Sequence, residues 1–146
     1  MRLWHYQLLP YLPDLQFKGQ LRELVAIMHD WREKGKTNHL LINRVMQYPK
    51  DHIRTYFLLY REEYKKRYGK DVSIKTTNEF IEFGGNRPWL TEIPFDGWHN
   101  TNYLRVCVCN LYEKYRFGVG KSKIMQAEWD RILQGYKDIT GEDYKI

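Results

Sequence analysis

The sequence predicts an all-α fold, a compact single-domain bundle of about four to five helices joined by irregular loops. Two observations predict it. Apolar residues recur at spacings of three and four over long stretches, as on one face of a helix. Proline and glycine lie at the boundaries of these stretches: Pro13 stands before the first one, and Gly35, Pro49 and Gly69 each follow one. A chain of 146 residues has the length of one domain, so we expect residues 1–146 to form a single domain.

The first long helix is expected from Asp14 to about Lys34. Asp14 follows Pro13 and is a suitable N-cap, and Gly35 suits the position after the last turn. The apolar positions of this helix are Leu15, Leu21, Leu24, Val25, Ile27, Met28 and Trp31.

Two further helices are expected before residue 70. A short one covers about Asn38 to Gln47 and ends before Tyr48-Pro49, because the residue before a proline disfavours the helical region. A longer one runs from about Asp51 to Tyr68, and basic residues in its last turn favour a helix C-terminus there. Its expected core face is Ile53, Tyr56, Phe57, Tyr60 and Tyr64.

The second half is predicted to hold a short helix and two longer ones. The short helix covers 77–83 and is followed by a loop at 84–88. A long helix starts at Asn100 or Thr101 and continues to about Tyr115. The loop Phe117–Ser122 leads to a last helix from about Ile124 to Tyr136.

The charge of the chain favours an anionic partner. The formal net charge is +6 and the sequence pI is about 9.2, so nucleic acid is the first class of partner to consider. No apolar run approaches the roughly 18 residues that a membrane span needs, and the N-terminus has no apolar signal-peptide core. We therefore expect a cytoplasmic protein with no membrane partner.

The residue pattern does not favour metal or cofactor chemistry. Cys107 and Cys109 are spaced C-x-C, which on a helix points their side chains about 200° apart, so we expect two reduced thiols. No second cysteine pair completes a zinc site, and the five histidines form no H-x-x-x-H pair. We expect no cofactor and no metal.

The glycine-rich loop at 118–122 has two interpretations. It resembles half of a P-loop, but position 115 is tyrosine and a helix is expected before it, so nucleotide hydrolysis is poorly supported. With Arg116, Lys121 and Lys123 around it, the loop suits a backbone phosphate. The alternative is a plain connector between helices with solvated lysines.

Glu23 lies away from the main apolar stripe of the first long helix. At about 100° per residue it falls on the far side from Leu21 but only about 40° from Ile27. It is therefore either solvated or in contact with a segment that covers Ile27. Its neighbour Arg22 falls on one flank of the stripe.

The N-terminus supplies an α-amine that can react as a nucleophile. An α-amine has a reference pKa of about 7.7–8.0, so part of it is a neutral nucleophile near pH 7. A carboxylate beside it handles protons while the amine attacks carbon. Two segments carry a resemblance: Met1-Arg2-Leu3-Trp4-His5-Tyr6-Gln7-Leu8-Leu9-Pro10 and Gln20-Leu21-Arg22-Glu23-Leu24. They are similar to the pyrimidine-dimer DNA glycosylase/AP lyase family (phage endonuclease V-like proteins), in its cellular and prophage branch.

The resemblance implies a fold, an activity and a set of site residues. The family fold is a compact all-α domain in which the N-terminal amine attacks the sugar C1′ of a damaged nucleotide. An imine forms, the base leaves, and β-elimination cuts the strand. By position, the nucleophile is the Met1 amine and the acid/base is Glu23. Arg2 and Arg22 bind phosphates and hold the pKa of the amine down.

The resemblance also implies the remaining contacts and the partner. His5, Arg116 and Lys121 complete the predicted DNA-binding set. The partner is double-stranded DNA, damaged or abasic, and we expect a monomer associated with the nucleoid. The family's further arginine, one turn after the glutamate, corresponds to Ala26 or Ile27 here, which leaves the lesion open.

Two alternatives stand beside the glycosylase. One is a non-catalytic nucleic-acid-binding module, which predicts salt-sensitive binding without strand cleavage. The other is a phage-type helical interaction protein whose tyrosines form a protein interface.

Overall fold

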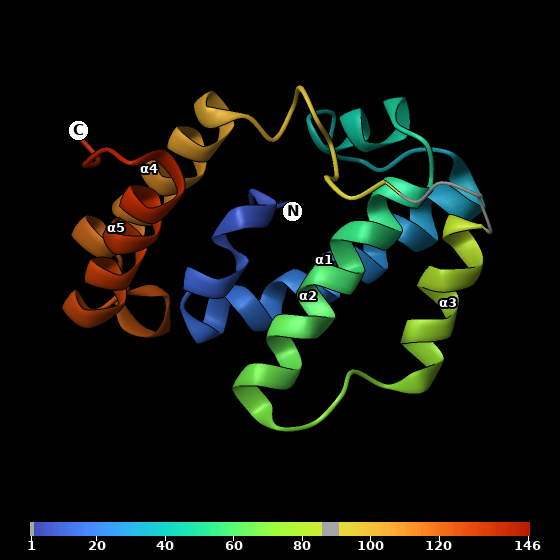
Figure 1. Cartoon of the computed structure of the whole chain (residues 1–146), viewed down its shortest axis with the longest axis horizontal. Coiled ribbons are helices and arrows are strands. Elements are labelled where there is room, and N and C mark those ends of the chain that lie inside the picture. The colour runs from blue at the N-terminus through green and yellow to red at the C-terminus, as the bar shows by residue number, and fades with distance from the viewer. Residues whose placement is uncertain (1, 86–90) are drawn as a thin grey trace. The chain divides into compact units, whose positions relative to one another are not determined.

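A computed structural model describes residues 2–85 and 91–146 of the chain (Figure 1). These residues form α-helices and short 3-10 helices and contain no strand, which confirms the predicted all-α class. In chain order the elements are η1 (Tyr6–Tyr11), α1 (Asp14–Lys34), η2 (Ile42–Gln47), α2 (Asp51–Tyr68), α3 (Ile74–Gly84), α4 (Thr101–Phe117), η3 (Gly120–Ser122) and α5 (Gln126–Thr140).

The chain divides into two compact units. The first unit comprises the residues up to Leu3 together with Gly19–Asp96, and the second comprises Trp4–Lys18 together with Gly97–Ile146. A single domain over 1–146 therefore stays a prediction, and each unit is described by itself.

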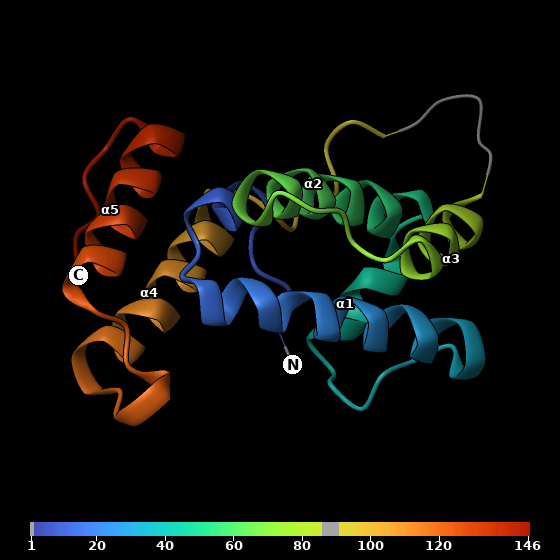
Figure 2. The same ribbon diagram turned by 90° about the horizontal axis from the view of Figure 1, so that it is seen from below.

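The core of the first unit is built from α1, α2 and α3. Figure 2 shows α2 lying over α1, and Figure 1 shows α2 and α3 side by side. The predicted core face of α2 is confirmed at Ile53, Tyr56, Phe57 and Tyr60, which are fully buried, whereas Tyr64 is only half-buried. The rings of Phe57 and Phe80 stack with centroids 4.2 Å apart, which fixes α3 against α2.

The bounds of α1 and α2 agree with the sequence prediction because local signals set them. Gly69 adopts the left-handed conformation (φ 65°), and its N–H donates to the Lys65 carbonyl (3.0 Å), which closes the last turn of α2. The basic residues of that turn lie where the helix dipole favours positive charge.

Three other elements differ from the prediction. The short helix expected over 38–47 forms only in its second half, as the 3-10 helix η2 that ends at Gln47 as predicted. At the start of the segment the Thr37 hydroxyl accepts the His39 N–H (3.0 Å), a local hydrogen bond that competes with a helix. The helix α3 begins three residues early because the Ser73 hydroxyl accepts the Thr76 N–H (3.3 Å) and caps it. The last helix starts at Gln126 and continues one turn beyond Tyr136. The loop predicted at 84–88 lies outside the described residues from position 86 onward.

The second unit is built from η1, α4 and α5. The helices α4 and α5 lie side by side (Figure 1) and bury apolar side chains between them. The buried side chains are Leu104, Cys107, Val108, Leu111, Trp129, Ile132 and Tyr136. Cys107 is buried, Cys109 is exposed, and both are free thiols, as predicted.

None of the helices within residues 2–85 and 91–146 combines the length and the apolar character that a membrane crossing requires.

Gly135 allows η1 to pack closely on α5. A Cβ atom at Gly135 would lie 2.4 Å from Cγ of the Tyr11 ring, and this ring is held by a hydrogen bond from its hydroxyl to Asp138 Oδ2 (3.1 Å). We expect Gly135→Ala to lower the free energy of unfolding by about 1–3 kcal/mol, although alanine favours helix, because the ring must move. Urea denaturation measures the change.

Gly19→Ala is the matched control within a helix. A Cβ atom at Gly19 would meet only Arg22 Nη2, at an ordinary 3.6 Å. This variant is expected to gain about 0.5–1 kcal/mol of stability. Equal effects of the two substitutions would contradict the close approach at Gly135.

Candidate active site

The carboxylate of Glu23 is bound to the N-terminal segment. Its Oε2 accepts the backbone N–H of Arg2 at 2.9 Å, and the Glu23 side chain is half-buried. Of the two environments open to Glu23 from the sequence, the structure therefore shows contact with another segment. Ile27, one turn further along α1, is fully buried.

Gln20 holds the same backbone from the other side. Its Nε2 donates to the carbonyl oxygen of Arg2 (2.9 Å), and its Oε1 accepts the hydroxyl of Tyr56 on α2 (3.1 Å). Gln20 and Tyr56 are both fully buried, so these hydrogen bonds are sheltered from water. The backbone N–H and C=O of Arg2 are thus both bound by side chains of α1.

The sequence did not predict that Gln20 or Tyr56 takes part in the site. A signal was present, because Gln20 lies three residues before Glu23 and side chains at this spacing share one face of a helix. Tyr56 was assigned to the core face of α2, where its hydroxyl needs a partner. Which partner it finds depends on how α1 packs on α2, which the sequence alone does not give.

The two predicted phosphate-binding arginines of the first unit differ in exposure. The side chain of Arg22 is exposed on α1 and its guanidinium lies over Gly19, whereas Arg2 is half-buried. Met1, the predicted nucleophile, lies outside the described residues. The structure therefore brings Arg2 and Glu23 together and leaves Arg22 on the outer surface beside them.

The comparison with protein families decides the identity. Residues 1–76 match the profile of the family described as pyrimidine dimer DNA glycosylase. The chain belongs to the pyrimidine dimer DNA glycosylase family. The resemblance predicted from the opening residues and the Gln20–Leu24 motif is confirmed. Searches among curated proteins and among solved structures found no match.

The residues that form the candidate site of this glycosylase family member all lie in the matched region. Arg2, Gln20, Glu23 and Tyr56 all fall within residues 1–76. Of the other residues predicted to contact DNA, His5 lies in the matched region, and Arg116 and Lys121 lie beyond it.

His5 is buried in the second unit. Its Nδ1 accepts the N–H of Gln7 (3.1 Å) and caps η1, and its ring stacks on Tyr6 and His99 with centroids 5.0 and 5.3 Å away. Burial lowers the pKa of His5 to about 4. With only 2% of its surface exposed, His5 offers little area to DNA.

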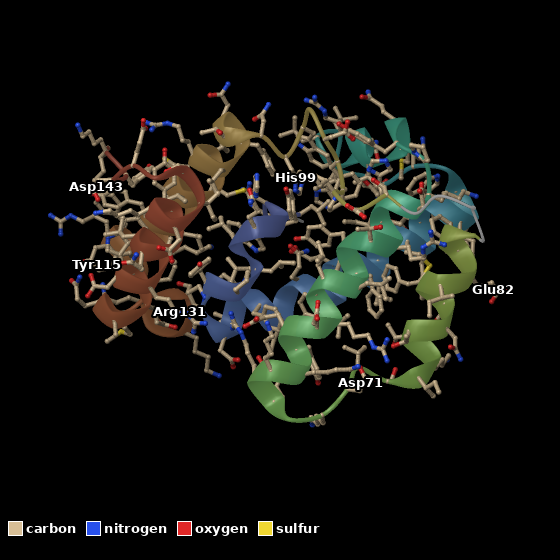
Figure 3. The ribbon with its side chains drawn as sticks, viewed as in Figure 1. Asp71, Glu82, His99, Tyr115, Arg131 and Asp143 are labelled. Carbon is tan, nitrogen blue, oxygen red and sulfur yellow. The ribbon has the colours of Figure 1, made fainter. Side chains whose placement is uncertain are left out.

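His99, labelled in Figure 3, is the counterpart of His5. Its Nδ1 accepts the N–H of Tyr6 (3.1 Å), and its ring stacks on Tyr103 at 4.9 Å. Two imidazoles therefore accept backbone N–H groups at the start of η1, and each accepting nitrogen is unprotonated. No feature of the sequence indicated a role for His99.

Arg116 and Lys121 are both exposed near the end of α4. The loop between α4 and α5 is closed by hydrogen bonds of its own: the N–H groups of Gly118 and Ile124 donate to the Lys114 carbonyl (3.1 and 3.3 Å). Tyr115, labelled in Figure 3, stacks on Trp129 with planes 10° apart. The amides of Gly118 and Ile124 are therefore used internally, while the side chains of Arg116 and Lys121 face solvent.

Proposed function

We propose that this family member is a DNA glycosylase with AP lyase activity whose nucleophile is the α-amine of Met1 and whose acid/base group is Glu23. The hydrogen bond between Glu23 Oε2 and the Arg2 N–H carries the proposal. Covalent geometry limits an α-amine on the preceding residue to about 4 Å from the Arg2 amide nitrogen, which supports Glu23 as the carboxylate that serves this amine.

The proposed chemistry begins with attack of the neutral amine on C1′. The C1′–N glycosidic bond breaks, the base leaves with the electron pair and takes up a proton, and the amine nitrogen, now bound to C1′, loses one proton. The lone pair of this nitrogen then forms the C1′=N double bond as the C1′–O4′ bond breaks, and O4′ takes up a proton, which leaves a protonated imine. Glu23 supplies the group that gives and takes these protons at the site.

The strand is cut in a second step. Removal of a proton from C2′ forms a double bond as the C3′–O bond breaks, and the 3′ phosphate leaves. Hydrolysis of the imine then frees the amine. Every atom needed comes from the DNA, the chain and water, so the mechanism calls for no metal or redox cofactor.

Gln20 and Tyr56 act as positioning residues in this proposal. Their hydrogen bonds hold the backbone of Arg2 and so limit where the adjoining amine can lie. A well-placed nucleophile loses less entropy on reaching its target carbon.

Phosphate binding is assigned to four basic side chains, three of them exposed and one, that of Arg2, half-buried. Arg22 and Arg2 serve the strand at the reaction site, and Arg116 and Lys121 serve a second stretch of backbone. The net charge of +6 supports a duplex DNA partner, bound by a monomer. His5 holds the start of η1 rather than contacting the DNA, because its ring is buried.

Borohydride trapping on an abasic duplex tests the proposal. We expect a covalent protein–DNA adduct from the native protein and none after acetylation of the N-terminal amine, because an acetylated amine forms no imine. A denaturing gel measures the adduct, and a pyrimidine-dimer duplex tests the glycosylase step.

Two results would favour the alternatives. Salt-dependent binding of the duplex with no adduct over a range of pH would indicate a non-catalytic nucleic-acid-binding module. Absence of both binding and adduct at low salt would favour a protein-interaction role.

A further inference from the structure

Two adjacent leucines stand almost fully exposed in the loop between α1 and η2. Leu40 and Leu41 each expose 87% of their surface. A single exposed leucine is common on protein surfaces, but two neighbouring ones at one turn leave an apolar projection. The flanking residues Thr37 and Ile42 are buried, so the chain is anchored on both sides of the pair.

The turn that carries the leucines is closed by hydrogen bonds. The N–H and the hydroxyl of Thr37 donate to Asn43 Oδ1 (2.7 and 2.8 Å), and Asn43 Nδ2 donates back to the Thr37 carbonyl (3.2 Å). The N–H of Asn43 also donates to the His39 carbonyl (3.1 Å). The two exposed leucines therefore lie on a turn whose conformation is fixed by hydrogen bonds.

The segment that carries the pair is basic, with one of its lysines, Lys34, 3.8 Å from the carboxylate of Asp30. From Lys34 to Lys50 the chain contains Lys36 and Arg44 as well, and no aspartate or glutamate. All four basic side chains are exposed. Basic side chains attract the phosphates on the outside of duplex DNA. Exposed apolar side chains can insert between base pairs, where the faces of the bases are apolar. A segment that combines the two is therefore suited to duplex DNA.

The turn belongs to the same unit as Glu23. Glu23 lies on α1, and Lys34 ends that helix eleven residues later, about 16 Å along the axis. Figure 2 shows the segment after α1 running back along this helix. A duplex advances about 3.4 Å per base pair, so the turn and Glu23 can reach the same few base pairs.

We infer that Leu40 and Leu41 form an apolar wedge that enters the duplex between base steps close to the damaged nucleotide. The inference rests on the proposed function, since it assigns a DNA-distorting role at the same site. Unstacking a step costs a few kcal/mol and is offset by the contacts that the bent duplex makes with the protein. The wedge fills the space that a displaced nucleotide leaves and holds C1′ open to the amine.

The double variant Leu40→Ala/Leu41→Ala tests the wedge. Because both side chains are exposed, the variant is expected to keep the wild-type circular dichroism spectrum and melting temperature. We expect binding to an abasic duplex to weaken by roughly tenfold for each leucine removed. The rise in fluorescence of a 2-aminopurine placed next to the abasic site should be lost. The slope of log affinity against log salt should stay unchanged, because no charge is removed.

Ile74→Ala is the matched control, since Ile74 is 78% exposed in the same unit, at the start of α3. It should bind and distort the duplex as the wild type does. If the wild type traps the abasic duplex and the double variant matches it in affinity and fluorescence, the wedge is overturned while the proposed function stands. If the wild type neither binds nor traps the duplex, the proposed function itself fails.

Discussion

Glu23→Gln is expected to slow cleavage of an abasic duplex by about 10²- to 10⁴-fold, the usual contribution of a general acid/base. Glutamine has nearly the same shape, and its side-chain oxygen can still accept the Arg2 N–H that Glu23 accepts at 2.9 Å. The amide cannot exchange protons with the sugar or the leaving base. The substitution therefore removes the chemistry and keeps the contact with the N-terminal segment.

Single-turnover cleavage and duplex affinity, measured on the same preparation, separate chemistry from binding. Affinity should not fall, because the change removes a negative charge from a protein that binds a polyanion. Glu33→Gln is the matched control, since Glu33 lies on the same helix with its side chain 62% exposed and only a 3.6 Å ion pair to Arg32. Cleavage by Glu23→Gln within threefold of the control would contradict a proton-transfer role for Glu23.

Local signals explain why two helices were predicted correctly from the sequence. Proline and aspartate at the start of α1, and Gly69 at the end of α2, act on groups within one turn of themselves. The start of the segment 38–47 was predicted less well because the Thr37 hydroxyl binds the His39 N–H and the Asn43 side chain binds the backbone of Thr37, and such local hydrogen bonds compete with a helix.

In the candidate site, too, local sequence features were predicted and contacts between distant residues were not. Glu23 could be selected because its place on α1 and its distance from the N-terminus can be read from the chain. The roles of Gln20 and Tyr56 depend on a contact between residues 36 positions apart, which no spacing rule supplies. His5 was assigned to DNA contact because it stands in the N-terminal motif, but its ring packs against His99, which lies far away in the sequence.

The burial of His5 makes the stability of the protein sensitive to acid. The pKa of His5 is lowered from 6.5 to about 4 because its ring is removed from water. Between these values the unfolded chain binds a proton that the folded chain does not, so stability falls as the pH falls through this window. One pKa unit is worth about 1.4 kcal/mol, so the loss should reach about 3 kcal/mol near pH 4 and change little below it.

His5→Asn should remove this pH dependence, because asparagine does not titrate and its side-chain oxygen can still accept the Gln7 N–H as an N-cap. The variant loses the ring stacking and should be less stable than the wild type at pH 7. Its free energy of unfolding, measured in urea from pH 7 to pH 4, should fall less steeply than that of the wild type.

The difference between the two pH profiles isolates His5 from the other titrating groups of the chain. His39→Asn is the matched control, since His39 is exposed, and it should follow the wild-type profile. Parallel profiles for His5→Asn and the wild type would mean that the folded protein accepts a proton at His5 as readily as the unfolded chain does. The His5 ring would then be accessible to water, and a direct contact with a DNA phosphate would again be open to it.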